Sequence, residues 1–317
     1  MKIVAQDWLP YCLRFNRAWQ TSQGMITERH GELFRLTTED GLISWGDYAP
    51  LPEFGINQAA ARAFANETAL LDLAAQRAGL TLRESLGGLG MIRSATVNTN
   101  LGAISNISEE AVVEAIEQGF SVLKLKVGIE PWAVEIARLI KLCKFLPTGV
   151  SFRLDANAAW SFSDAYNFIS ACKNLPIEGL EEPLNNPSKT SLSDLQKISP
   201  FPIALDESTH LIDADFFCQP PVKRMIIKPA RQGGVMATIK LGVRAKASGI
   251  ECVVTSSLES ICGVLTCAQI AAALAPDSVH GLATSQWFSG DQGQGCSIEA
   301  GNLLLPSVAG LGFSLKN

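Results

Sequence analysis

The sequence predicts an α/β protein in which a TIM-type (β/α) barrel follows an N-terminal α+β capping domain. A chain of 317 residues is long enough for about two domains, or for one barrel with additions. From residue 93 onward, short β-branched runs alternate with helical segments, as repeated βα units do. Most of these runs end on a polar residue directly before a loop, which gathers polar side chains at one end of a barrel.

The N-terminal part of the chain carries the signals of the capping domain. Two stretches, 1–15 and 25–48, alternate between apolar and polar residues and predict β-hairpins, with a turn at 39–41. The Ala- and Leu-rich stretch 57–83 contains no proline and predicts a helix that ends at Gly79. The sheet is therefore expected first and the helix second.

A loop rich in proline, residues 49–55, separates the predicted strands from the predicted helix. It contains Phe54, an aromatic residue in an otherwise turn-like segment. Two interpretations remain open, a simple connector and a loop that covers a substrate. Together with residues 17–24, this loop is where we expect substrate specificity to be determined.

Eight strand-like runs between residues 93 and 285 predict the barrel. The polar last residues of six of them are 22 to 29 positions apart, about one βα unit each. A doubly wound open sheet is the competing architecture, but it would spread these residues along an edge. We expect residues 1–92 to form the cap and residues 286–317 to return to it. The runs are SATVNTN, SVLKLKVG, VSFRLDAN, IEGLEEP, FPIALDES, RMIIKPA, ECVVTSS and SVHGLAT.

The composition excludes several classes of function. The chain has 26 basic and 31 acidic residues, so no overall positive charge would attract nucleic acid. It contains no apolar run long enough for a membrane span and no signal-peptide core. Its eight cysteines form no CxxC pair and predict buried, reduced thiols. We therefore expect a soluble cytoplasmic protein that acts on a small molecule, and no signal indicates its oligomeric state.

Three acidic residues, Asp155, Glu181 and Asp206, end consecutive predicted strands. Each alone would more often be a solvated strand end or a helix cap. Three converging carboxylates repel one another unless a cation joins them, and oxygen ligands without His or Cys suit Mg²⁺ or Mn²⁺. Glu182 competes with Glu181 for this role. The alternation of side chains along the strand favours Glu181.

Three lysines are expected beside these acids. Lys124 and Lys126 share one face of an alternating run, and Lys228 closes a strongly apolar one. An amphipathic edge strand with solvated lysines is the alternative for the first two. Burying Lys228 is costly unless it meets negative charge. Lysines on both sides of a metal-bound carboxylate suit the removal of a proton α to that carboxylate, because the enediolate needs electrostatic stabilisation.

Four further residues are candidate substrate contacts, and we add Lys124 to them. Arg153 and Asn157 share the face of Asp155 by counting in twos. Ser256 and Ser257, at the end of the seventh run, could donate hydrogen bonds to a substrate carboxylate near a helix N-terminus. Ordinary helix capping explains the two serines equally well.

These motifs resemble those of the enolase superfamily, in the branch that includes the muconate-lactonizing enzymes. The resemblance covers essentially the whole chain and implies a modified TIM-type (β/α)7β barrel with an N-terminal α+β capping domain. The motifs that carry it are KLK at 124–126, RLDAN at 153–157, LEEP at 180–183, LDES at 205–208, IIKP at 226–229, and the later SSLES and HGL segments.

Within that branch, GDYAPLPEFG, RLDANAAW and the short length most resemble the o-succinylbenzoate synthase family. The resemblance implies syn dehydration of 2-succinyl-6-hydroxy-2,4-cyclohexadiene-1-carboxylate to o-succinylbenzoate in menaquinone biosynthesis, by a Mg²⁺-dependent hydro-lyase. It implies Lys126 as the base and then the acid, and Lys228 as the group that stabilises the enediolate. It also implies Asp155, Glu181 and Asp206 as metal ligands.

Two alternatives remain at this point. An N-acylamino acid racemase, or another epimerase of the superfamily, would use the same two lysines. Dipeptide epimerases of the branch carry Asp-x-Asp at the eighth strand, where this chain has HGLATSQ and offers an ammonium group no acid. A catalytically silent barrel that serves as a binding module is the alternative outside enzymes, but such a chain would be expected to lose ligands or lysines.

Overall fold

The computed structural model describes residues 2–21 and 24–316. The N-terminal part is an antiparallel sheet of β1 (Ile3–Thr21), β2 (Gly24–Thr38) and β3 (Ile43–Tyr48), in that order. The predicted turn at 39–41 is confirmed, since the Gly41 N–H donates to the Thr38 carbonyl. The expected loop at 17–24 is wrong in part, because β1 continues to Thr21. The rest of that loop includes residues 22–23, which lie outside the described part.

Helix α1 (Gln58–Ala78) packs against β3 and confirms the predicted helix. The Asn57 side chain caps its first turn, and Gly79 ends it in the left-handed conformation, as predicted. The helix approaches the sheet very closely at Gly46, where a Cβ atom would lie 1.9 Å from the Ala65 carbonyl oxygen. Glycine is therefore required at this position of β3.

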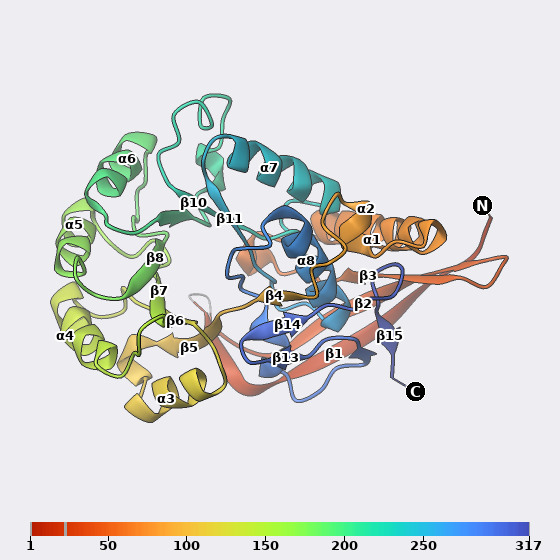
Figure 1. The fold of residues 1–317 in the computed structure, drawn as a ribbon, viewed down its shortest axis with the longest axis horizontal. Helices are drawn as coiled ribbons and strands as arrows, with labels where there is room; N and C mark the ends of the chain where they lie inside the picture. The colour runs from red at the N-terminus through yellow and green to blue at the C-terminus, as the bar shows by residue number, and fades with distance from the viewer. Residues whose placement is uncertain (1, 22–23, 317) are drawn as a thin grey trace.

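Seven parallel strands form a curved sheet, a half-barrel in which each strand pairs with its neighbours in the sequence (Figure 1). Helices α3 to α6 lie along its outer side. The strands are β5 (Thr99–Ala103), β6 (Val122–Lys126), β7 (Ser151–Asp155), β8 (Ile177–Glu181), β9 (Ile203–Leu205), β10 (Arg224–Ile227) and β11 (Glu251–Val254). The helices between and after them are α3 (Glu109–Glu117), α4 (Trp132–Cys143), α5 (Phe162–Ala171), α6 (Lys189–Ile198), α7 (Val235–Ala247) and α8 (Ile261–Leu274).

The eighth predicted strand is reduced to a short bridging segment. His280 makes an isolated parallel bridge to Val97, and Gly281 makes one to Thr255. The segment formed by His280 and Gly281 therefore contacts the chain at both edges of the half-barrel. The His280 side chain is fully buried and braces this segment, because its Nδ1 accepts the Val254 N–H and its Nε2 lies 2.9 Å from the Ala275 carbonyl oxygen.

Several C-terminal residues lie against the N-terminal part of the chain. Phe15 bridges Phe288, and the Leu82 N–H donates to the Gly310 carbonyl. Figure 1 shows β15 beside the N-terminal sheet. The remaining strands are β4 (Ser94–Thr96), β12 (Gly293–Gln294), β13 (Ile298–Glu299), β14 (Asn302–Leu304) and β15 (Ser314–Leu315). The remaining helical turns are η1 (Pro52–Phe54), α2 (Leu82–Ser85), η2 (Ile104–Asn106), η3 (Thr209–Leu211) and η4 (Ala283–Trp287).

All eight cysteines are free, as predicted, but they are not all buried. Cys12 and Cys218 are exposed, because the first lies on the outward face of β1 and the second lies in a loop. Cys262 and Cys267 are buried in α8, as expected for core residues. Within the described ranges, no helix is both long enough and apolar enough to cross a membrane.

Candidate active site

The ends of neighbouring parallel strands bring the predicted lysines and acids to one edge of the half-barrel. Lys126, the last residue of β6, pairs in register with Asp155, the last residue of β7. Asp155 pairs in turn with Glu181, the last residue of β8. Asp206 directly follows β9, and Lys228 directly follows β10. The register of the sheet thus assembles two amines and three carboxylates that lie far apart in the sequence.

Lys124 lies two residues before Lys126 and forms ion pairs with two of the acids. Its Nζ is 2.8 Å from Asp155 Oδ2 and also contacts Glu181 Oε2. Burial alone would lower the pKa of Lys124, but the two carboxylates outweigh it and raise that pKa above its usual value. Lys124 is therefore a charged counterion inside the acid cluster and a poor base.

Asp206 is held by two cations. Lys228 Nζ lies 2.5 Å from its Oδ2, and Arg231 Nη2 lies 2.9 Å from its Oδ1. Burial would raise the pKa of Asp206, but the charges of Lys228 and Arg231 outweigh it and lower that pKa to about 2. The third predicted metal ligand is thus an ionised carboxylate.

The acid cluster fits a divalent cation by its chemistry. Glu181 Oε1 is buried and has no hydrogen-bond partner among the described residues. A buried acceptor of this kind costs free energy unless a positive group or a donor meets it. The three carboxylates offer oxygen donors only, as Mg²⁺ prefers. Their oxygens do not all lie within 4.8 Å of one another, and Lys124 stands between Asp155 and Glu181.

A cavity of about 700 Å³ opens over this cluster. Its size suits a small-molecule substrate. The structure brings nine of the ten predicted site residues to its wall, namely Lys124, Lys126, Asp155, Asn157, Glu181, Asp206, Lys228, Ser256 and Ser257. Lys126 differs from the other two lysines, because it has no ion-pair or hydrogen-bond partner within the described chain. Its amine is the one of the three that no described carboxylate contacts.

Arg153 is the predicted substrate contact that the structure does not place in the cavity. Its side chain is 1% exposed, and its Nε and Nη2 each donate to Glu178 over 2.9 Å. The prediction failed because Arg153 lies two residues deeper along β7 than Asp155. It shares the register of the sheet with Gly179, below the row of catalytic candidates. Arg153 and Glu178 instead form an ion pair beneath the site.

The competition between Glu181 and Glu182 is resolved by their contacts. Glu181 lines the cavity, whereas Glu182 does not. Glu182 instead accepts hydrogen bonds from the backbone N–H groups of Asp206 and Ser208 and from the Ser208 hydroxyl. It thereby fixes the loop that carries Asp206. Asn157 lines the cavity and donates to Glu207 Oε1 over 3.1 Å.

The two serines after β11 differ in their contacts. Ser256 Oγ lies 2.5 Å from Thr284 Oγ1. Ser257 Oγ is buried, lines the cavity and has no hydrogen-bond partner in the described part of the chain. Neither is the cap of α8, because that role falls to Ser260. Ser257 is therefore available to a ligand, which favours the substrate-binding interpretation over helix capping.

The proline-rich loop contributes to the cavity wall, which favours the substrate-covering interpretation over a simple connector. Glu53, Phe54 and Gly55 all contribute to the wall, and the Phe54 ring lies 5.7 Å from Lys228 Nζ. Buried Arg29 of β2 holds this loop against the loop after β11. Its guanidinium donates to the carbonyls of Ala49 and Pro50 and to that of Leu258.

Sequence reasoning missed Arg231, Glu207 and Arg29. Arg231 lines the cavity three residues after Lys228, and Glu207 directly follows Asp206, so their proximity to known candidates was the available signal. Burial raises the pKa of Glu207 to about 7, with a further contribution from the charge of Asp206. Arg29 gave no local signal, since its three acceptors are backbone carbonyls of distant segments.

Comparison with known proteins places these residues in a family context. Residues 107–317 match the family described as enolase C-terminal domain-like. The chain is 33% identical to L-Ala-D/L-Glu epimerase from Bacillus subtilis over 65% of this chain, a match that spans 57% of the epimerase. It is 29% identical to o-succinylbenzoate synthase from Pectobacterium atrosepticum over 82% of this chain and 83% of the synthase.

Among solved structures, the dipeptide epimerase from Enterococcus faecalis, complexed with Mg and the dipeptide L-Leu-L-Tyr, is similar to this chain. The TM-score is 0.87 and the identity 25%, over 99% of this chain and 100% of that one. Both a synthase and epimerases are thus among the similar proteins.

Proposed function

The chain belongs to the enolase superfamily, and from this premise we propose that it is a metal-dependent enzyme that removes a proton α to a carboxylate. The observation that carries the proposal is Lys126. It faces the cavity without a carboxylate partner, beside three acids that hold the other lysines. A general base must be able to approach the proton that it abstracts, and Lys126 is the one of the three lysines without an ion-pair partner among the described residues.

We assign Asp155, Glu181 and Asp206 to a divalent cation, Mg²⁺ or Mn²⁺. When bound, the cation supplies charge stabilisation for the substrate carboxylate as it gains enediolate character. Lys126 removes the α proton of a hydroxycyclohexadiene carboxylate. Its ammonium form then gives that proton to the departing hydroxyl group, so that water leaves and the ring becomes aromatic. Lys228 places a positive charge on the other side of the cluster, and Ser256 and Ser257 donate to the substrate.

For the substrate, we propose 2-succinyl-6-hydroxy-2,4-cyclohexadiene-1-carboxylate, with o-succinylbenzoate as product. The similar synthase aligns with most of this chain and most of its own length. The cavity wall from residue 281 to 287 also supports this choice. Its described lining residues are Gly281, Ala283, Thr284 and Trp287, none of which is acidic. A dipeptide ammonium group would find no carboxylate on this wall.

Racemisation or epimerisation of an N-acylated amino acid is the second candidate. One observation favours it, because Lys126, the last residue of β6, and Lys228, directly after β10, lie on different sides of the acid row, as a proton transfer between two faces needs. Similar proteins also include epimerases. The dehydration, by contrast, would need a base on one face of the substrate only. A single pair of bases and a metal can thus serve both reactions.

For the architecture, we propose that the seven parallel strands and the bridging residues His280 and Gly281 form a (β/α)7β barrel. This catalytic barrel would comprise residues 93–285. Residues 1–92, joined by 286–317, would form the cap.

The test compares the two candidate reactions in deuterium oxide with Mg²⁺ present. The proposal predicts an aromatic product, detected by ultraviolet absorbance, from the cyclohexadiene substrate. It predicts much slower α-deuterium incorporation into N-acylamino acids, measured by NMR. Rapid deuterium incorporation without aromatic product would favour the racemase. The absence of both signals would contradict both candidate functions.

A further inference from the structure

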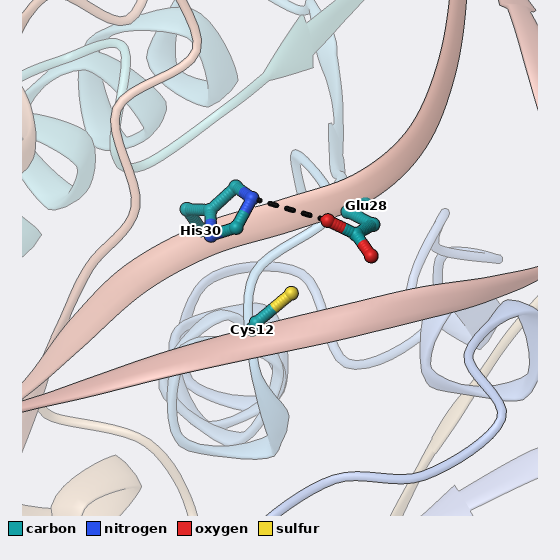
Figure 2. A group of neighbouring side chains, drawn as sticks. All are labelled: Cys12, Glu28 and His30. Carbon is teal, nitrogen blue, oxygen red and sulfur yellow. Dashed lines mark ion pairs between the residues drawn. The ribbon is translucent and has the colours of Figure 1, made fainter.

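A second group of metal-ligating side chains lies outside the cavity, on the N-terminal sheet. Figure 2 shows Cys12 of β1 with Glu28 and His30 of β2, their side chains directed toward one another. Each offers one ligand atom, and the three atoms lie within 4.8 Å of one another. It is the one group of three such residues that meets this condition in the described part of the chain.

The register of the two strands preorganises this group. Cys12 pairs directly with His30 across the antiparallel ladder. Glu28 lies two residues from His30 and therefore shares its face. Cys12 and His30 are both exposed, so this is the outward face of the sheet. Three ligands thus project from a fixed backbone, and only side-chain rotations are needed to bring them onto one ion.

We propose that Cys12, Glu28 and His30 bind a zinc-class divalent cation on the outward face of β1 and β2. A thiolate, an imidazole and a carboxylate are the three ligand types that zinc takes in proteins. The 3.5 Å between His30 Nε2 and Glu28 Oε2 is close to the separation of about 3.5 Å between two ligands of a tetrahedral zinc ion. Water takes the fourth position at this exposed site.

The donor set separates this site from the acid cluster. Mg²⁺ prefers oxygen ligands only, whereas a sulfur and a nitrogen donor favour a softer ion. Arg14 competes for Glu28, with its Nε 3.2 Å from Glu28 Oε1. The Arg14 side chain is 76% exposed, and such surface ion pairs contribute little free energy. A cation at Glu28 can therefore displace the arginine.

Binding there would act on the cap, because the same strands support the cavity from their other face. Arg29 lies between Glu28 and His30 and holds the loops at Ala49 and Leu258. A cation shared by Cys12 and His30 would join β1 to β2 at that level. We expect slower amide exchange in residues 11–14 and 28–31 when the ion is bound.

The test measures Zn²⁺ binding by calorimetry in excess Mg²⁺, on the full chain and on four variants. We expect one site per chain in the unaltered protein. Cys12→Ser and His30→Ala should each weaken it by at least about tenfold, a conservative figure for a lost ligand since even outer partners cost 10–100-fold. Cys218→Ser, which removes the other exposed thiol, and Lys197→Ala should leave it unchanged.

Circular dichroism checks that each variant is folded. We expect that they are, because Cys12 and His30 are exposed. Unchanged Zn²⁺ affinity in both Cys12→Ser and His30→Ala would overturn the proposal, because the ion would then bind elsewhere, for example at the acid cluster. The absence of saturable binding would overturn it as well. Neither result bears on the dehydration, which is assayed with Mg²⁺ alone.

Discussion

At the scale of single residues, the chemistry depends on which charged group contacts which oxygen. Glu181 and Glu182 are adjacent in the chain, yet one faces the cavity and the other fixes the loop at Ser208. Their carboxylates therefore provide a matched pair for separating metal binding from stability.

The first prediction uses that pair. Glu181→Gln should lose Mg²⁺ affinity and activity, because a neutral amide is a poor partner for the cation. Glu182→Gln should lower the free energy of unfolding by about 1.5–3 kcal/mol, the usual contribution of hydrogen bonds to a charged group. Calorimetry with Mg²⁺ and urea unfolding measure the two effects. Equal loss of Mg²⁺ affinity in both variants would contradict the assignment.

The second prediction concerns buried His280. Burial lowers its pKa from 6.5 to about 4, so the unfolded chain binds a proton that the folded chain refuses between these values. Its contribution to stability is therefore complete above about pH 6.5 and is lost as the pH falls toward 4. We expect this residue alone to cost about 2 kcal/mol between about pH 7 and about pH 5.

The measurement is the difference in unfolding free energy between the original protein and His280→Asn at both pH values. This difference should shrink as the pH falls. Glu259 serves as a control of opposite sign, because burial raises its pKa to about 7, above the usual 4.5. Its contribution is lost as the pH rises from 4.5 through 7. A constant difference for His280→Asn would show that the residue is not buried in its neutral form.

At the scale of elements, the cavity is completed by loops that the N-terminal sheet holds in place. Tyr11 donates to Asp47, which in turn accepts from the backbone and hydroxyl of Ser260. Arg29 joins the loop at 49–50 to Leu258. The sheet thus positions the covering loop and the serine-bearing loop together.

The third prediction follows from this arrangement. Arg29→Lys should raise KM by about tenfold with a smaller change in kcat, because one ammonium group cannot replace three directed guanidinium donors. Arg35→Ala is the matched control on the same strand, since its pair with Asp7 is at the surface and contributes little. Steady-state kinetics checks both variants. An equal effect of the two on KM would show that the clamp does not position the substrate.

At the scale of the whole molecule, much of the fold could be predicted from the sequence. Alternating strands and helices predicted the parallel sheet, and the polar strand ends predicted which residues meet at its edge. The site predictions that failed depended on how deep a residue lies in the sheet and on contacts between distant segments. Arg153 has the right face but lies one layer too deep, and Arg29 acts through backbone carbonyls that no side-chain pattern reveals.

The proline-rich loop and the exposed thiols illustrate the same limit. Phe54 could be placed in a loop from the sequence, but its position beside Lys228 depends on how the cap sits on the sheet. The cysteines lie mostly in apolar segments, which predicts burial, yet Cys12 is exposed. Its face of β1 is decided by the register with β2, which local hydrophobicity does not show.

The most direct test of the central claim is the rate of aromatic product formation by Lys126→Ala with Mg²⁺ and the cyclohexadiene substrate. A general base contributes about 10²–10⁴-fold, so a loss of at least this size is expected, with the fold intact by circular dichroism. Lys228→Ala should also lose turnover, whereas Lys197→Ala, on the surface, should not. Substantial product formation by folded Lys126→Ala would contradict the account.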